Sequence, residues 1–130
     1  MPDPAGPILW AISFLLLKHA VADYYLQTPY QYRNKGTYGH LGGLLHAGLH
    51  VLFTLPVFLI IAPISLLAGA LIVAGEFVVH YHVDWIKEQF VKRNRLTSEN
   101  ATYWQAMGTD QLAHGLTYVL IVAILAGALN

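Results

Sequence analysis

The chain has 130 residues, of which 56% are hydrophobic and only 11% are charged. A soluble domain of this size carries about 25% charged residues, so the composition indicates an integral membrane protein whose main partner is the lipid bilayer. Lys plus Arg and Asp plus Glu balance at 7 each, which gives the chain no general attraction to nucleic acid. The absence of cysteine excludes disulfides and thiolate metal ligands.

Four apolar segments follow one another along the chain. They predict helices over about 8–27, 40–62, 64–87 and 100–129, each long enough to cross a hydrocarbon core of about 30 Å. Pro56 predicts a kink in the second helix, and Pro63 marks a tight hairpin before the third. Residues 1–7 lack a basic region and a small-residue cleavage pattern, so we expect no removable signal peptide. We expect an all-α fold, a single domain over 1–130 that forms an integral membrane, antiparallel four-helix bundle.

The basic residues predict the orientation of this bundle. All of them except Lys18 fall in or beside the first and third connections, at Arg33, Lys35, Lys87, Lys92, Arg93 and Arg95. The two termini and the second connection carry no Lys or Arg. The positive-inside rule therefore predicts that the first and third connections are cytoplasmic and that both termini are periplasmic, in a bacterial inner membrane.

Each predicted span carries one polar pair with i,i+4 spacing, which puts both side chains on one helix face about one turn apart. The pairs are His19 with Asp23, His46 with His50, His80 with Asp84, and Asp110 with His114. The topology places all four pairs in the cytoplasmic leaflet. The deeper layer is His19, His50, His80 and His114, and the outer layer is Asp23, His46, Asp84 and Asp110.

These pairs need compensation inside a membrane. An ionised side chain within a span costs roughly 2.5 to 3.5 kcal/mol on insertion scales, so three aspartates together are very unfavourable unless they are paired or bind a cation. We interpret the eight side chains as ligands of a mono- or dinuclear metal site. Nitrogen and oxygen ligands without thiolates make zinc the first choice of divalent metal, with iron or manganese as alternatives.

A metal-bound water with a lowered pKa would suit the hydrolysis of an ester or phosphoester in an amphipathic or lipid-linked substrate that arrives from the cytoplasmic side. Candidate catalytic residues are Glu76, one turn deeper than His80, together with Asp84 and Lys87. Lys87 lies at the predicted cytoplasmic mouth, where it either binds an anionic group or extends to the interface, as such lysines commonly do. Glu76 otherwise pairs with a hydroxyl such as that of Thr54 or Tyr118.

Other interpretations of the polar pairs stay open. They include a purely hydrogen-bonded polar core, a metal transporter or sensor, and a haem-binding electron carrier. His82 lies about 200° around the helix from His80 and is expected to face lipid headgroups or a neighbouring helix, while His40 is expected at the membrane interface. The sequence predicts no particular oligomeric state.

Four ordered stretches, KHAVADYYLQ, HAGLH, HYHVDWIK and DQLAHG, resemble the motifs of a small bacterial integral-membrane domain family of unknown function. That family looks like H-x-x-x-D-[FY]-x-[LI]-Q, H-x-x-x-H, H-x-x-x-D-[YW]-x-K and D-Q-x-x-H. The resemblance adds Gln27, Lys87 and Gln111 to the eight candidate ligands as motif positions, and it implies no activity. A weaker resemblance, to membrane-bound predicted metal-dependent hydrolases, implies the hydrolase expectation.

Overall fold

The computed structural model describes residues 4–127, and within them every regular element is helical. The elements in chain order are α1 (Ala5–Tyr24), α2 (Pro29–Asn34), α3 (Leu41–Thr54), the 3-10 helix η1 (Leu55–Leu59), α4 (Leu66–Arg93) and α5 (Ala101–Ala126). Four stretches are long and apolar enough to cross a membrane: Ala5–Tyr24, Leu41–Leu59, Leu66–Arg93 and Ala101–Ala126. The all-α, membrane-bundle prediction is therefore confirmed.

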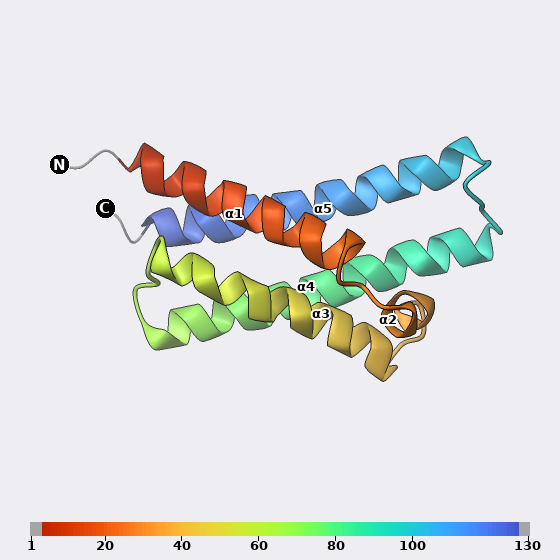
Figure 1. Cartoon of the computed structure of the whole chain (residues 1–130), viewed down its shortest axis with the longest axis horizontal. Coiled ribbons are helices and arrows are strands. Elements are labelled where there is room, and N and C mark those ends of the chain that lie inside the picture. Colours follow the sequence, from red (N-terminus) through yellow and green to blue (C-terminus); the bar gives the residue numbers. More distant parts are fainter. Residues whose placement is uncertain (1–3, 128–130) are drawn as a thin grey trace.

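The four long helices run antiparallel in a bundle (Figure 1). Helix α1 packs against α3 and α5, and α4 packs against the other sides of α3 and α5, so each long helix turns one face toward a common axis. The start of α1, the end of α5 and the connection from η1 to α4 lie at one end of the bundle. Helix α2 and the α4–α5 connection lie at the opposite end, which we call the α2 end.

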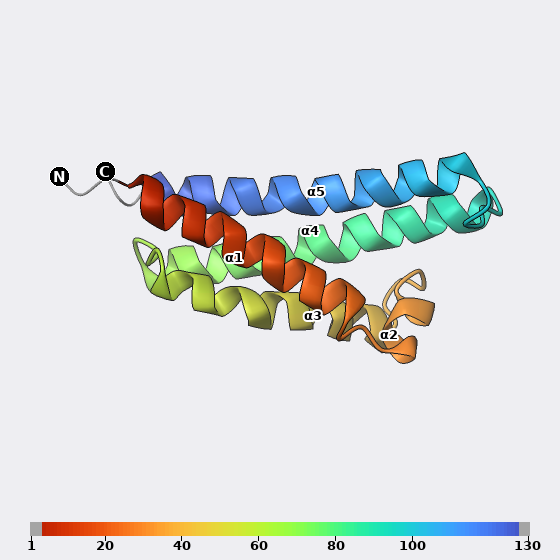
Figure 2. The same cartoon turned by 45° about the horizontal axis from the view of Figure 1, so that its top comes forward.

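Helices α4 and α5 extend further at the α2 end than α1 and α3 do (Figure 2). At about 1.5 Å per residue, the 28 residues of α4 span about 42 Å. This exceeds the hydrocarbon thickness of about 30 Å. The α4–α5 hairpin is thus long enough to pass through the headgroup layer.

The interior has an apolar half and a polar half. Near the chain ends, nine buried side chains form an apolar cluster: Ala11, Leu15, Val57, Ile61, Ile72, Tyr118, Ile121, Val122 and Leu125. Toward the α2 end, most buried side chains are instead histidines, aspartates and lysines. Large apolar side chains such as Trp10, Leu59 and Leu66 are exposed on the outside, as expected where the solvent is lipid.

The helix bounds differ from the sequence expectation at several ends. The first long helix ends at Tyr24, because Thr28 and Gln31 form a capping box that starts the separate helix α2 in a segment expected to be a polar connection. Pro56 lacks a backbone N–H, and the second span changes from α to 3-10 geometry there. The third continues to Arg93, and residues 128–129 of the fourth lie outside the described residues.

Candidate metal centre

Four imidazoles, one from each long helix, meet at the bundle axis. The ring centroids of His50 and His80 are 3.8 Å apart, and those of His80 and His114 are 4.1 Å apart. His19 closes the circle at 4.9 Å from His114 and 5.2 Å from His50. All four are buried, with His50 at 0% and His80 at 1% exposure. The four histidines predicted to form the deeper layer therefore lie next to one another in the structure.

Asp23, His46 and Asp84, which were predicted one turn closer to the cytoplasm, lie close to one another and to these imidazoles. Nε2 of His46 lies 3.2 Å from Oδ1 of Asp23 and 3.1 Å from Oδ2 of Asp84. Oδ1 of Asp23 is also 3.0 Å from Nε2 of His50. The other oxygen of Asp84, Oδ1, lies 3.3 Å from Nε2 of His114. The Asp84 carboxylate thus stands between the imidazole of His46 and that of His114.

All eight predicted ligands fall into groups whose donor atoms lie within 4.8 Å of one another. The groups are Asp23, His46, His50 and His80; then His19, His80 and His114; then Asp84, Asp110 and His114. The groups combine residues from the two predicted layers. His46 was predicted in the outer layer and His80 in the deeper layer, yet their ring centroids are 5.2 Å apart. The first and third groups share no residue, so seven of the eight side chains form two separate ligand sets.

Several polar atoms in this cluster have no hydrogen-bond partner within residues 4–127. They are both ring nitrogens of His46 and of His80, Nδ1 of His50, Oδ2 of Asp84 and Oδ1 of Asp110. The contacts of His46 with Asp23 and Asp84 are short enough for ion pairs but lack hydrogen-bond geometry. Each buried polar group left unpaired costs about 1–3 kcal/mol. A cation bound by one nitrogen of each of these rings and by the carboxylate oxygens would remove part of that cost.

The charges of the buried side chains do not balance. Within the described residues, the buried carboxylates are Asp23, Glu76, Asp84 and Asp110, and the buried ammonium groups are those of Lys18 and Lys35. Four negative and two positive groups leave two negative charges if every histidine is neutral. One divalent cation would cancel this excess, and a second would make the cluster positive.

Lys35 is a charged member of this cluster that the sequence expectation did not include. Its Nζ lies 3.4 Å from Oδ2 of Asp84. Burial opposes its charge, but the carboxylates of Asp84 and then of Asp23 outweigh burial and raise the pKa of the Lys35 amine. A side chain on Gly42 or Gly43 would press on the segment before α3: a Cβ would come within 2.5 Å of the Tyr30 carbonyl or 3.2 Å of the Lys35 Cα. Gly42 and Gly43 therefore let the segment that carries Lys35 pack closely against the start of α3. This pair of glycines is the feature of the sequence that could have indicated where Lys35 lies.

A buried ion pair lies next to the histidines on the side of the apolar half. Nζ of Lys18 is 2.6 Å from Oε1 of Glu76 and donates to the backbone oxygen of His50 at 3.0 Å. The hydroxyl of Thr54 donates to the same Glu76 oxygen at 2.8 Å. Glu76, expected as a catalytic residue or as the partner of a hydroxyl, is thus bonded to Thr54 and to Lys18, whose role the sequence did not reveal. Its catalytic role stays a prediction.

His19 differs from the other imidazoles because both its nitrogens have partners. The Tyr118 hydroxyl lies 3.0 Å from Nδ1 of His19, and Oε1 of Gln111 lies 3.0 Å from Nε2. Since Oε1 only accepts, Nε2 carries the proton and Nδ1 accepts from the hydroxyl. The Gln111 amide donates to Oδ2 of Asp23 at 3.2 Å and to Oδ2 of Asp110 at 3.1 Å. Gln111 therefore joins His19 to two carboxylates of the candidate ligand sets.

The remaining singled-out residues lie around the cluster. Gln27 donates to the backbone oxygen of Asp23 at 2.7 Å. Lys87 contacts the neighbouring carboxylate of Glu88. His82 meets the Tyr38 hydroxyl at 3.1 Å, so it packs against a neighbouring segment. His40 caps α3 by accepting from the amide of Gly42 at 3.0 Å.

Comparison with known proteins gives a family for this chain. Residues 11–129 match the family described as Protein of unknown function (DUF3307). The chain belongs to that family. The match includes every candidate ligand from His19 to His114 and confirms the expected membership in a family of unknown function, while the individual motifs and the weaker hydrolase resemblance stay predictions. No curated protein and no solved structure matches the chain.

Proposed function

We propose that this protein is an integral membrane metalloenzyme that hydrolyses a phosphoester in an amphipathic substrate at a site for two divalent metal ions. The observation that carries the proposal is the pair of separate ligand sets with Asp84 between them. Oδ2 of Asp84 faces His46 at 3.1 Å, and Oδ1 faces His114 at 3.3 Å. With one carboxylate oxygen directed at each set, Asp84 would be able to help hold an ion in both.

The two sets are suited to different roles. The first offers four side chains, Asp23, His46, His50 and His80. Together with the Asp84 oxygen that faces His46, they would give this set five protein ligands and leave it without an open position for water. Structural zinc sites are closed with four protein ligands. The second offers three, Asp84, Asp110 and His114. Three protein ligands with a further position for water are typical of catalytic zinc sites. Zinc is our first choice, and iron and manganese also accept this mixture of nitrogen and oxygen.

Charge favours an anionic substrate. Two divalent cations would bring four positive charges to a cluster that carries two net negative charges from its buried carboxylates and lysines. The excess of two positive charges in a low-dielectric interior would attract a phosphate group. Divalent ions of this kind polarise a phosphoryl oxygen and activate water for attack.

The hydrolysis would use the protein's own groups as follows. The oxygen of water bonds to phosphorus while the bond from phosphorus to the alcohol oxygen breaks, and that oxygen keeps the bonding electron pair. Asp110 takes the proton that water releases and delivers it to the departing alcohol oxygen. Asp84 holds the two sets together, and Lys87 pairs with the anionic group of the substrate. Glu76 keeps the ammonium group of Lys18 against the backbone oxygen of His50, so its influence reaches the site through His50.

The proposed orientation follows from charge at the α2 end. This end carries Arg33 in α2 and Lys92 and Arg93 at the end of α4, which the positive-inside rule assigns to the cytoplasm. The chain would then form one four-span domain in a bacterial inner membrane, with both termini on the periplasmic side. The metal centre would lie in the cytoplasmic leaflet.

Elemental analysis of the purified protein tests the proposal most directly. We expect about two divalent ions per chain, the composition of a two-metal site. The same protein should release p-nitrophenol from a long-chain alkyl p-nitrophenyl phosphate, lose this activity on chelation and regain it with zinc. Stably folded protein that neither contains metal nor binds it on titration would contradict the metal centre. Metal-loaded protein without chelator-sensitive turnover would contradict the enzyme.

Substituting His19 and His80 should separate a supporting histidine from a ligand. His80→Gln removes a member of the four-ligand set and should reduce the bound metal to about one ion per chain. His19→Gln leaves both separate sets complete and should keep about two ions, with affinity lowered about 10–100-fold, the effect typical of groups that orient ligands. Metal titration of both variants measures the difference. Equal loss of metal in the two variants would contradict this division of roles.

Metal transport is a second candidate, favoured by one observation. The buried Lys18–Glu76 pair extends the polar interior beyond the histidines toward the apolar half, as a transport path would. Transporter sites are typically built from discontinuous helices, whereas α1, α3, α4 and α5 are continuous at all eight candidate ligands. Metal flux into proteoliposomes that is lost in His50→Ala would favour transport or a related sensing role over hydrolysis.

Haem binding is less compatible with the geometry. Axial haem ligands stand on opposite faces of a macrocycle, but the rings of His50 and His80 contact each other at 3.8 Å between centroids. A Soret band in the visible spectrum of the purified protein would show bound haem and would support the electron-carrier alternative.

A further inference from the structure

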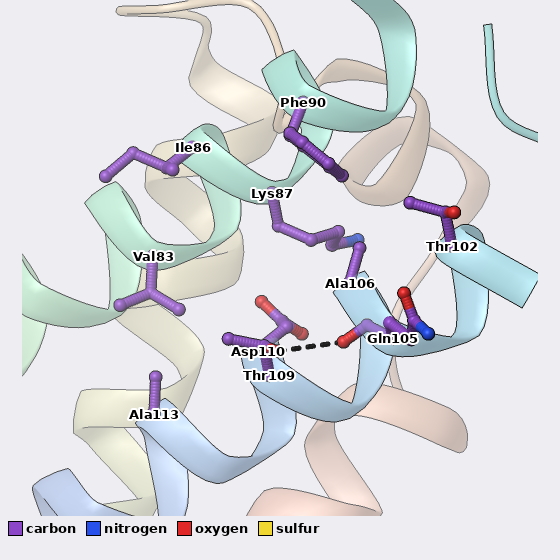
Figure 3. Close-up of a pocket in the computed structure, with 10 residues that line it drawn as sticks. All are labelled: Val83, Ile86, Lys87, Phe90, Thr102, Gln105, Ala106, Thr109, Asp110 and Ala113. Carbon is purple, nitrogen blue, oxygen red and sulfur yellow. Dashed lines mark hydrogen bonds between the residues drawn. The ribbon is translucent and has the colours of Figure 1, made fainter. Parts of the chain in front are cut away.

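An apolar cavity of about 440 Å³ lies between α4 and α5 near the α2 end. Figure 3 shows Val83, Ile86 and Phe90 lining it from α4, and Ala106, Asp110 and Ala113 lining it from α5. Ile86 is 59% exposed and Phe90 is 44% exposed, so the cavity reaches the outer face of the bundle. Its volume falls within the range of about 300–1,000 Å³ that is typical of small-molecule sites.

The inner wall of the cavity is part of the candidate metal centre. Asp110 is only 4% exposed, yet its carboxylate lines the cavity. Oδ1 of Asp110 lies 3.6 Å from Nε2 of His114 and has no hydrogen-bond partner among the described residues. The same carboxylate belongs to the three-ligand set with Asp84 and His114. A molecule in this cavity would therefore lie next to the three-ligand set.

Positive charge surrounds the other side of the cavity. The side chain of Lys87 extends along it toward Ala106 (Figure 3), with its amine paired to Glu88. Beyond it, the end of α4 and the following turn carry three exposed basic residues, Lys92, Arg93 and Arg95, and one exposed acidic residue, Glu99. The hairpin is thus positive overall, which favours an anionic headgroup by about 1 kcal/mol for each basic side chain near the membrane surface.

We propose that the α4–α5 cavity binds an anionic phospholipid from the surrounding bilayer, with an acyl chain in the cavity and its phosphate beside Lys87. The assignment of this lipid as the substrate rests on the proposed metal-dependent hydrolysis, whereas its binding rests on the cavity and on the basic side chains beside it. The apolar part of the lining favours a lipid over a water-soluble phosphate ester, because the ester has no chain to cover it. The small side chains of Ala106 and Ala113 leave room for that chain.

Photo-crosslinking in nanodiscs tests the binding. The probes are phosphatidic acid and phosphatidylcholine that carry a diazirine in the same acyl chain, each at a low fraction in a phosphatidylcholine bilayer. We expect phosphatidic acid to label peptides from residues 83–90 and 102–113 about fivefold more strongly than phosphatidylcholine, the ratio that corresponds to the effect of one basic side chain. Equal labelling by the two probes, or labelling spread over all lipid-facing helices, would overturn the proposal.

Two variants and a control locate the lipid. Ala106→Trp fills the cavity and should lower labelling by phosphatidic acid at least about tenfold, the change that corresponds to 1.4 kcal/mol. Lys87→Gln leaves the cavity open and should remove most of the preference for phosphatidic acid, so it tests the site even if Ala106→Trp does not fold. Ala123→Trp places the same bulk on an exposed position of α5 and should leave labelling unchanged. Full labelling of a folded Ala106→Trp protein would overturn the proposal.

Metal content measured on the same preparations separates the two proposals. Selective labelling of protein that binds no metal would support the lipid site and refute the hydrolase. Metal-loaded protein that turns over p-nitrophenyl esters but shows no selective labelling would overturn the lipid site alone. Release of phosphate from phosphatidic acid, lost in both Ala106→Trp and chelated protein, would support both.

Discussion

Replacing Asp84 with asparagine should reduce the metal bound by the purified protein from about two ions to one or fewer per chain. Asparagine keeps the shape of the side chain but replaces one oxygen by an amide nitrogen, which cannot bind a metal ion while it carries its protons. Since the two Asp84 oxygens face His46 and His114 separately, the exchange removes the link between the two ligand sets. Hydrolytic activity should fall below detection. Metal titration followed by elemental analysis measures the loss.

The matched control is Glu88→Gln, the same exchange of carboxylate for amide about one turn along α4. Glu88 contacts Lys87 and is a member of none of the ligand groups found in residues 4–127. This variant should bind metal as the parent does. The bridging role is wrong if Asp84→Asn retains two tightly bound ions, or if both variants lose metal equally.

Breaking the buried pair of Lys18 and Glu76 should destabilise the bundle strongly. Lys18→Ala leaves the Glu76 carboxylate, which is 2% exposed, without its cation. Removal of one partner of a buried ion pair costs about 3–5 kcal/mol. Unfolding in mixed detergent micelles, followed by tryptophan fluorescence, should show a loss of this size. The loss should persist in chelated protein, since the pair is separate from both ligand sets.

A second substitution should recover most of that stability. Combining Lys18→Met with Glu76→Leu replaces both charges by apolar groups, which is often neutral or stabilising at buried sites. By comparison, Lys87→Ala breaks a partly exposed pair, for which about 0–1 kcal/mol is expected. A Lys18→Ala loss no greater than that of Lys87→Ala would show that the buried pair contributes little. A double variant as unstable as Lys18→Ala would contradict the charge-based explanation.

The convergence of the four polar pairs was predictable because two simple regularities act together. Spacing of i,i+4 fixes which side chains share a helix face, and antiparallel spans of similar length fix their depth. His19, His50, His80 and His114 therefore had to lie at one height. Nothing in that reasoning sets the distances between helices. Only the coordinates show that His46, expected in the outer layer, groups with His50 and His80 of the deeper layer. The same is true of the separation of the ligands into two sets.

Lys35 and Lys18 were missed for different physical reasons. Lys35 lies in a segment that looked like a polar connection, and its burial depends on α2 packing against the glycines that start α3. Lys18 lies within a span, where a lysine is expected to extend toward the interface unless a buried acid faces it. Its partner Glu76 was singled out from the sequence, but the two lie on helices that are far apart in the chain. Only the packed bundle brings them together.

The α4–α5 cavity could not be predicted either, because it depends on how two helix surfaces fit. The sequence gives the small residues Ala106 and Ala113 but not what faces them. In the bundle they lie opposite Val83 and Ile86, and the mismatch in side-chain size leaves a space. Lys87, expected at a cytoplasmic mouth, borders that space.

The distribution of the ligand groups over four helices has a consequence for how the protein is made. During synthesis, the helices insert into the membrane before they associate. Each ligand group draws on at least two long helices, and together the groups need all four. A nascent chain with one helix misplaced leaves carboxylates and imidazoles facing lipid, which marks it for membrane proteases. If the proposed metal ions hold the four helices together, cells deprived of metal should accumulate less of this protein, even while its synthesis rate stays the same.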